Sequence, residues 1–250
     1  RHFFGYPITP QTEISAYMSK KMPKIGGTFL QAESEIAAIN MVLGAASAGV
    51  RAMTSSSSPG ISLKSEGISY IAGSDLPCLI LNVQRGGPGL GGIQPSQSDY
   101  NQATKAPGHG DLHLIVLAPA TVTEMVGFVG RAFDLAEKYR MPAMILADGT
   151  LGQMMEPVEF PEEKEYVPIA KPWATNGHQN KRPHNIVNSL YLKPEDLERT
   201  NFERFKRYEQ LCANEQDWEE FLTDDAEIII TAFGVASRVA KSGIEKARGE

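Results

Sequence analysis

Short apolar runs alternate with helical patterns through the first 150 residues, and this alternation most constrains the fold. The runs are TFLQ (28–31), RAMTS (51–55), CLILNVQ (78–84), LIVLAP (114–119) and AMILAD (143–148). Continuous apolar strands of this kind are typical of parallel sheets that helices cover on both faces. The sequence therefore predicts an α/β fold with an open, mostly parallel sheet. Such sheets bind their ligands at the carboxyl ends of the strands.

Two helices between these runs are well marked. Residues 121–140 repeat apolar side chains at helical spacing, and Thr121 with Glu124 forms a capping box at the start. Residues 36–48 are apolar on nearly every side, with Asn40 as the one polar side chain before Ser47. We therefore expect this second helix to be central and buried.

Composition changes after Asp148 and predicts four parts of the chain. Residues 1–155 form the α/β domain, residues 156–193 a proline-rich linker, and residues 194–222 a charged interdomain helix. Residues 223–250 contain the apolar run AEIIITAFG (226–234) and then an amphipathic helix, which predicts the start of a second α/β domain. Because the chain starts at an arginine and stops inside a helical pattern, we expect it to be a piece of a longer polypeptide.

Charge and cysteine usage exclude several classes of function. The net charge is −6 and Lys and Arg form no block, which argues against a nucleic-acid or anionic-membrane surface. No apolar run approaches the ~20 residues that span a bilayer. The two cysteines, Cys78 and Cys212, fit no CxxC pattern, so we expect no disulfide, zinc site or iron–sulfur cluster on this chain. A reducing cytoplasm fits this usage.

A glycine-rich loop, RGGPGLGG (85–92), follows the apolar run 78–84. Its GPGLGG formally matches GxGxxG, but Pro95 delays any helix and no acidic residue ends the next strand. Nicotinamide binding is therefore disfavoured. Arg85, at a strand's carboxyl end, suits bidentate capture of a carboxylate or phosphate, although a surface arginine beside a mobile loop stays an alternative.

Three other loops carry polar groups. In GYPITP (5–10), Thr9 and Pro10 are typical of an N-cap and first helical residue, and a hydroxyl at a helix N-terminus also suits an anion. TSSSSPGISL (54–63) predicts a helix start at Ser58-Pro59, with most of its serines in capping roles. We expect His109, between two glycines, to line the ligand site, although a lone histidine is more often structural.

Two glutamates, Glu33 and Glu35, lie where an apolar run gives way to the apolar helix. Carboxylates are costly to desolvate, so they rarely enter such a place without a partner. Acidic side chains also favour helix N-termini, which accounts for Glu33. For Glu35, at the head of a helix apolar on nearly every side, we expect limited contact with water and a partner from a ligand.

Taken together, these segments resemble the alpha chain of 2-oxoacid:ferredoxin oxidoreductases, relatives of pyruvate:ferredoxin oxidoreductase, and most of all the 2-ketoisovalerate (3-methyl-2-oxobutanoate) type. The segments are GYPITPQTEI, QAESEIAAINMVLGAASAG, TSSSSPGISLKSEGISYIAGSDLPC, QRGGPGLGGIQPSQSDY and GHGDLHLIVLAP. NSLYLKPEDLE (188–198) and LTDDAEIIITAFG (222–234) extend the resemblance over nearly the whole chain. YPITP, QAESE and RGGPGLG are specific as a set.

The resemblance implies a pyrimidine-binding domain for thiamine diphosphate in residues 1–155 and a transketolase C-terminal-like second domain. It implies a beta subunit that supplies diphosphate and Mg²⁺ binding, and a ferredoxin-like subunit with iron–sulfur clusters. A dimer of such heteromers would oxidise a branched 2-oxoacid with CoA to acyl-CoA and CO₂ and reduce ferredoxin, in anaerobic metabolism. The segment ADGT (147–150) lacks the first glycine of the GDG diphosphate motif, which fits this division.

The family's functional residues correspond to positions of this sequence. Counting back from Gly44-Ala45, the glutamate that contacts N1′ of the pyrimidine and activates the cofactor corresponds to Glu35. Thr9 and Arg85 correspond to the residues that hold the substrate carboxylate, with Gly86 and Gly87 lining the site. No role transfers to Glu33 or to an individual serine.

Three other functions stay open at this point. The first keeps the chemistry and changes the substrate to 2-oxoglutarate or another 2-oxoacid. The second is a non-catalytic scaffold or binding subunit, against which the intact set Thr9, Glu35 and Arg85 argues. The third and most distant is a nicotinamide-dependent dehydrogenase.

Overall fold

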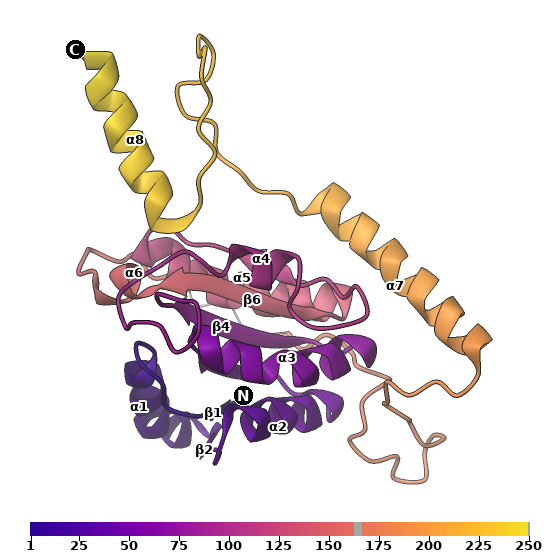
Figure 1. The fold of residues 1–250 in the computed structure, drawn as a ribbon. Helices are drawn as coiled ribbons and strands as arrows, with labels where there is room; N and C mark the ends of the chain where they lie inside the picture. Colours follow the sequence, from indigo (N-terminus) through magenta and orange to yellow (C-terminus); the bar gives the residue numbers. More distant parts are fainter. Residues whose placement is uncertain (163–166, 250) are drawn as a thin grey trace.

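A single parallel sheet organises the molecule, a computed structural model that describes residues 1–162 and 167–249. The six strands run in the order β2-β1-β3-β4-β6-β5, and every pairing is parallel (Figure 1). They are β1 (His2–Gly5), β2 (Thr28–Gln31), β3 (Ala52–Ser56), β4 (Cys78–Gln84), β5 (Ile115–Leu117) and β6 (Pro142–Asp148). The predicted α/β fold is therefore confirmed, and the strand order reverses between β1 and β3, where such sheets bind ligands.

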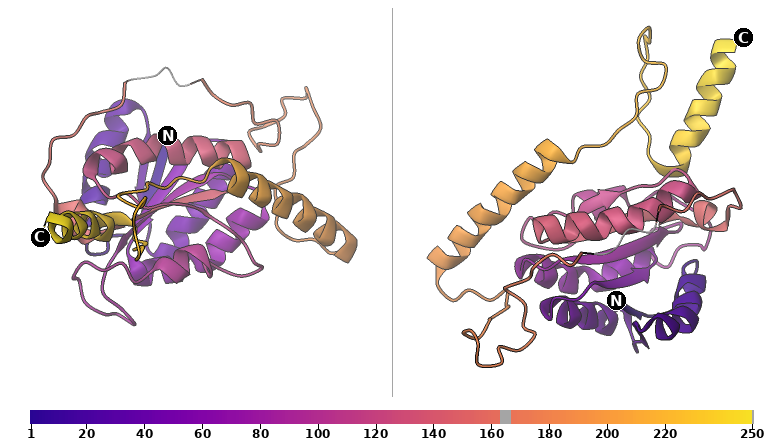
Figure 2. Two further views of the ribbon diagram at one scale, coloured as in Figure 1. Left: turned by 90° about the horizontal axis from the view of Figure 1, so that it is seen from above. Right: turned by 180° about the vertical axis from the view of Figure 1, so that it is seen from behind.

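Helices cover both faces of the sheet (Figures 1 and 2). One face carries α2 (Glu35–Ser47) and α3 (Ser58–Gly73), and the other carries α1 (Thr12–Lys21) and α5 (Val122–Tyr139). Successive strand side chains alternate between the two cores, so Leu79 and Leu81 pack toward α5 while Cys78 and Ile80 pack toward α3. The remaining helices are η1 (Met22–Ile25), α4 (Tyr100–Thr104), α6 (Gly149–Gln153), α7 (Pro194–Asn214) and α8 (Gly234–Gly249).

The predicted caps and helix burial are met in part. Thr121 accepts a hydrogen bond from the Glu124 N–H at 3.0 Å, while the Glu124 carboxylate accepts one from the Ala120 N–H at 2.7 Å. The expectation that the helix over 36–48 is central and buried holds for one of its faces. Only the face with Ile39 is buried, and Ile36 is 49% exposed, because within the described residues nothing covers the outer side of α2.

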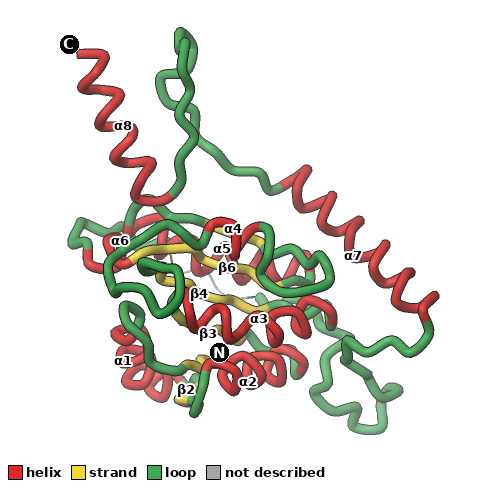
Figure 3. The backbone as a smooth tube through the Cα atoms, viewed as in Figure 1, coloured by secondary structure: helices red, strands yellow, loops and turns green. Residues whose placement is uncertain are grey.

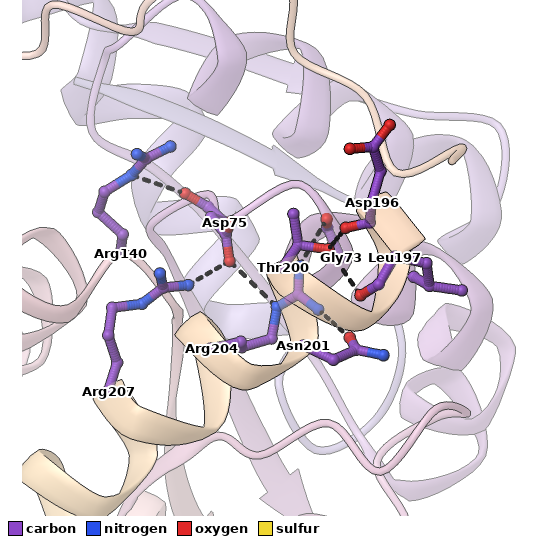
Figure 4. Close-up of polar contacts among 9 residues, drawn as sticks. All are labelled: Gly73, Asp75, Arg140, Asp196, Leu197, Thr200, Asn201, Arg204 and Arg207. Carbon is purple, nitrogen blue, oxygen red and sulfur yellow. Dashed lines mark hydrogen bonds and ion pairs between the residues drawn. The ribbon is translucent and has the colours of Figure 1, made fainter. Parts of the chain in front are cut away.

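Helix α7 lies outside the two helical layers and is fastened to the end of α3 through one carboxylate (Figure 4). Asp75 accepts hydrogen bonds from Arg204 Nε at 3.1 Å and from Arg207, and its backbone oxygen accepts one from Arg140 Nε at 3.2 Å. Tyr208, on the same helix, stacks on His113 with ring centroids 4.6 Å apart. Asp75 thus couples α7 to the core.

The C-terminal third differs from the prediction in two places. The helix expected over 194–222 ends at Asn214, and the charged residues that follow it bond to α5 instead of continuing the helix: Glu215 accepts hydrogen bonds from Lys138 at 2.6 Å and from the Tyr139 hydroxyl at 2.8 Å. The strand expected over 226–234 is irregular, and Ile228 is 84% exposed, because no described strand pairs with it (Figure 3). The predicted linker, 156–193, is irregular where described, but 163–166 lie outside the described residues, as does residue 250. The domain boundaries stay a prediction.

Candidate functional site

The predicted site residues follow different strands of the sheet. Thr9 lies after β1, Glu35 after β2 and Arg85 directly after β4. Because all strands are parallel, their carboxyl ends share one edge, and β1, β2 and β4 deliver these residues to it. The gap between β1 and β3, where the strand order reverses, lies within this edge.

Glu35 and Glu33 differ in exposure, as the sequence predicts. Glu33 is exposed, whereas Glu35 is only 6% exposed. Glu35 is the first residue of α2, and the preceding Ser34 caps the helix by accepting a hydrogen bond from the Ala37 N–H at 3.1 Å. A helix N-terminus carries partial positive charge, so an acidic side chain is well placed at this position.

A second helix N-terminus meets Glu35 through a glycine. A Cβ atom built on Gly60, in the first turn of α3, would lie 2.9 Å from Glu35 Oε1 and 2.1 Å from Ser56 Oγ. Any side chain at position 60 would therefore displace the carboxylate or the serine hydroxyl. Gly60 lets Glu35 approach the start of α3, where the field of that helix also favours negative charge.

Arg85 and Thr9 are brought together. Arg85 is 6% exposed, and its guanidinium donates hydrogen bonds to the Thr9 backbone oxygen at 2.9 Å and to the Leu90 backbone oxygen at 3.0 Å. Its Nε atom is buried and has no hydrogen-bond partner among the described residues. A guanidinium has five N–H donors, so Arg85 keeps several for an anion beside the exposed residue Thr9.

The expected capping role of Thr9 is wrong. Helix α1 starts at Thr12 and its N-cap position is Gln11. The fully buried Gln11 side chain donates a hydrogen bond to the Tyr6 backbone oxygen at 2.9 Å and accepts one from Ser55 Oγ at 2.6 Å. These bonds hold the turn at Thr9 and Pro10 in front of the helix. The Thr9 hydroxyl therefore lies before the N-cap position and does not cap α1.

The glycine-rich loop after Arg85 closes on itself. Gly86 N–H donates to the Gln94 oxygen, and Gly92 N–H donates to the Gly86 oxygen, each at 2.9 Å. Gly91 has a φ of +60°, and a Cβ there would lie 1.8 Å from the Gly86 oxygen, so only glycine fits. The loop therefore presents Leu90, which is 80% exposed, at its tip beside Gly87.

Several polar residues that anchor this loop escaped the sequence interpretation. Asp99 accepts hydrogen bonds from Ser58 Oγ at 2.6 Å and from Asn82 Nδ2 at 3.0 Å, and its own N–H donates to Gln84 Oε1 at 3.0 Å. The signal was present, because two amide side chains interrupt the otherwise apolar run 78–84. Asn82 and Gln84 bond Asp99 to β4, so the segment between Arg85 and Asp99 is attached to this strand where it starts and where it ends. This attachment holds Arg85 in place.

Polar atoms without partners collect near the end of β3. Within the described residues, Thr54 Oγ1, Ser56 Oγ and Ser57 Oγ are buried and make no hydrogen bond, and Lys64 Nζ and Asn82 Oδ1 share this state. Buried polar groups are normally satisfied, so such a collection is typical of a ligand site. Burial lowers the pKa of Lys64 to about 8, against the opposing attraction of Glu35.

His109 does not join this edge. Its backbone N–H donates to Ser69 Oγ at 3.0 Å, and its ring meets Tyr70 edge-on at 6.2 Å between centroids, near the end of α3 that is far from Glu35. The reason is topological. The next strand, β5, is parallel to the others, so the chain must return to the opposite edge before residue 115.

The described residues hold no group of three or more His, Cys, Asp and Glu side chains arranged for a metal ion. Nor does any described helix combine the length and apolar character needed to cross a membrane.

The fold and the placement of Glu35, Arg85 and Thr9 define a class, an open parallel α/β domain with its ligand site at the strand ends. Residues 1–220 match the family model described as pyruvate flavodoxin/ferredoxin oxidoreductase, thiamine diP-bdg. The chain belongs to this family, and the resemblance seen in the sequence is confirmed.

Curated relatives and a solved structure agree with this assignment. Ketoisovalerate oxidoreductase subunit VorB of Methanothermobacter thermautotrophicus is 52% identical over 99% of this chain and 70% of its own length. 2-Oxoglutarate synthase subunit KorA of the same organism is 36% identical over 99% of this chain and 73% of its own. The structure of 2-oxoglutarate:ferredoxin oxidoreductase from Magnetococcus marinus, with 2-oxoglutarate, coenzyme A and succinyl-CoA bound, matches with a TM-score of 0.83 at 30% identity. The match covers all of this chain and 48% of that one, so this chain spans about half of it.

Proposed function

We propose that this chain is the part of a 2-oxoacid:ferredoxin oxidoreductase that binds the pyrimidine end of thiamine diphosphate. The enzyme would convert 2-ketoisovalerate and CoA to a branched acyl-CoA and CO₂ and reduce ferredoxin. One observation carries the proposal: a buried carboxylate, Glu35, lies at the strand-order reversal, on the edge that also holds Arg85 and Thr9. Buried polar atoms without partners at the same edge fit a polar cofactor ring.

Each residue has a role that its surroundings support. Glu35 would accept a hydrogen bond from N1′ of the pyrimidine ring, since its backbone position favours a carboxylate. Arg85 would hold the substrate carboxylate with its free N–H groups, and Thr9 would add its hydroxyl. When bound, thiamine diphosphate supplies the carbanion chemistry that releases CO₂ from a 2-oxoacid.

Other chains would complete the enzyme. A beta subunit would bind the diphosphate and Mg²⁺, and a ferredoxin-like subunit would carry the iron–sulfur clusters, in a dimer of heteromers. The sequence ADGT in place of GDG supports this division, and the relatives VorB and KorA are themselves named as subunits. Titration of thiamine diphosphate against this chain with and without the beta subunit tests it. Tight binding by this chain alone would contradict the division.

Glu35→Gln in the assembled enzyme tests the role of the carboxylate. We expect turnover to fall by about 10²-fold or more, because removal of a positioned proton-handling group typically has this effect. Glu33→Gln is the matched control, since Glu33 is exposed two residues away and should leave turnover unchanged. If Glu35→Gln retains near-normal turnover, the assigned role is wrong and a scaffold function gains support.

A turnover screen across 2-oxoacids tests the substrate. The 52% identity to a ketoisovalerate oxidoreductase subunit, against 36% to a 2-oxoglutarate synthase subunit, favours the branched substrate. We expect the highest kcat/KM with 2-ketoisovalerate. A preference for 2-oxoglutarate would refute the substrate assignment and leave the chemistry intact.

A further inference from the structure

Lys64, in the middle of α3, is a buried cation to which the proposed function assigns no role. Its side chain is fully buried, and its Nζ atom has no hydrogen-bond partner in the described part of the chain. Lysine is almost never fully buried unless it is paired, because removing the ammonium group from water is costly. A residue kept in such a place calls for a specific reason.

The packing of α3 on α2 places Lys64 beside Glu35. Gly60 and Gly67 lie on the same face of α3 as Lys64, one turn before it and about one turn after it. A Cβ atom at Gly60 would lie 2.9 Å from Glu35 Oε1, and one at Gly67 would lie 2.4 Å from Ile39 Cγ2. Glu35 and Ile39 are also one turn apart, so Lys64 lies between these two close contacts.

The direction of the side chain brings the ammonium group closer still. Helical side chains lean toward the N-terminus of their helix, so Lys64 extends toward the turn of Gly60, against which Glu35 packs. The two charges form no ion pair among the described residues, yet the Glu35 carboxylate raises the pKa of Lys64 against the larger effect of burial. With a pKa of about 8, Lys64 is mostly charged at neutral pH.

We propose that Lys64 is a positioning residue whose buried ammonium group attracts the Glu35 carboxylate and orients it toward the ligand edge. This inference rests on the proposed function of Glu35. In that state the carboxylate accepts a hydrogen bond from a protonated ring nitrogen of the cofactor. Without the cation, the carboxylate loses the group that fixes its direction, and its hydrogen bond to the cofactor ring would be poorly aligned.

A double-mutant cycle in the assembled enzyme tests the proposal. The proteins are the wild type, Lys64→Met, Glu35→Gln and the double variant, with Lys181→Met as a control at an exposed loop lysine. Thiamine diphosphate affinity is measured by calorimetry from pH 6 to pH 9, and kcat/KM is measured over the same range.

We therefore expect Lys64→Met to lower kcat/KM about tenfold at pH 7, because the Glu35 carboxylate loses the group that orients it. It should weaken thiamine diphosphate binding about tenfold at pH 7. In the Glu35→Gln background the same substitution should change neither quantity, because Lys64 acts through the charge of Glu35.

Three results would overturn the proposal. They are unchanged cofactor binding and kcat/KM in Lys64→Met, an equal loss in both backgrounds, and failure of both Lys64→Met and Lys64→Leu to assemble. The last counts because a buried lysine that makes no hydrogen bond or ion pair among the described residues should be dispensable for folding. If Glu35→Gln itself binds the cofactor and turns over normally, the proposed function fails instead, and the two failures are thereby distinguished.

Discussion

Replacing Lys64 by methionine should make the folded chain more stable at neutral pH. Methionine has a similar length and carries no charge, so it fills the same space between α2 and α3 without desolvating an ammonium group. The pKa of Lys64 falls from 10.5 to about 8 in the folded state. Since one pKa unit corresponds to about 1.4 kcal/mol, the buried charge costs about 3 kcal/mol of unfolding free energy.

The sign of this effect changes predictably with pH. The folded-state pKa lies below the unfolded-state value, so between pH 8 and 10.5 the unfolded chain binds more protons, and stability rises with pH. The cost is complete below pH 8 and vanishes once lysine is neutral in both states. Lys64→Met should therefore gain about 3 kcal/mol at pH 7 and almost nothing above pH ~11.

Urea unfolding of the chain at pH 7, 8.5 and 10 measures this difference. With a slope of about 3 kcal/mol per molar urea, the gain at pH 7 corresponds to a midpoint about 1 M higher. Lys181→Met should leave the midpoint unchanged at every pH. A variant no more stable than the wild type at pH 7, or a gain that does not shrink with rising pH, would refute the reasoning.

Three more predictions concern the scaffold. Burial raises the pKa of Glu137, but hydrogen bonds from Arg51 and Lys171 outweigh it and lower the pKa below its usual range. Glu137→Gln should therefore cost about 3 kcal/mol of unfolding free energy at pH 7, and progressively less as pH falls below the usual glutamate pKa, as thermal melts at several pH values will show. A thiol reagent should label the native chain at the exposed Cys212 and spare Cys78, whose pKa burial raises to about 12; equal labelling by mass spectrometry would contradict this. Asp75→Asn should loosen α7 and speed its cleavage in limited proteolysis at least several-fold. An unchanged rate would show that the other contacts of α7, such as the aromatic stack and the bond from Arg204 to the Gly73 backbone oxygen, hold the helix.

Much of the sheet could be predicted because its signals are local. The strands over 28–31 and 78–84 have the predicted bounds, since a continuous apolar run between polar loops allows few other conformations. Glu35, Arg85 and Thr9 could be placed at one edge because parallel topology puts every strand's carboxyl end there. The sequence also distinguished Glu35 from Glu33. Glu35 begins a helix whose sequence is almost entirely apolar, which predicts its burial, whereas Glu33 precedes that helix.

The failures have a common cause in contacts between distant segments. The apolar run 226–234 has high strand propensity, but it has no described partner strand. His109 sits among glycines as a site residue would, but the parallel pairing of β5 carries it to the opposite edge. Thr9-Pro10 has the composition of a helix cap, yet Gln11 takes that position because its side chain bonds Ser55 on a neighbouring strand.

By itself, the sequence determined the α/β class, the edge at which the chemistry lies and the family to which the chain belongs. Each of these depends on periodicity or on motifs that are complete within a short segment. Only the tertiary structure decided that Arg85 is tied to Thr9, that Gly60 admits the Glu35 carboxylate, and that Lys64 is buried beside it. Burial and charge pairing depend on which helices meet, and Lys64 and Glu35, 29 positions apart in the sequence, lie on different helices. The electrostatic state of the site is therefore a property of packing between α2 and α3.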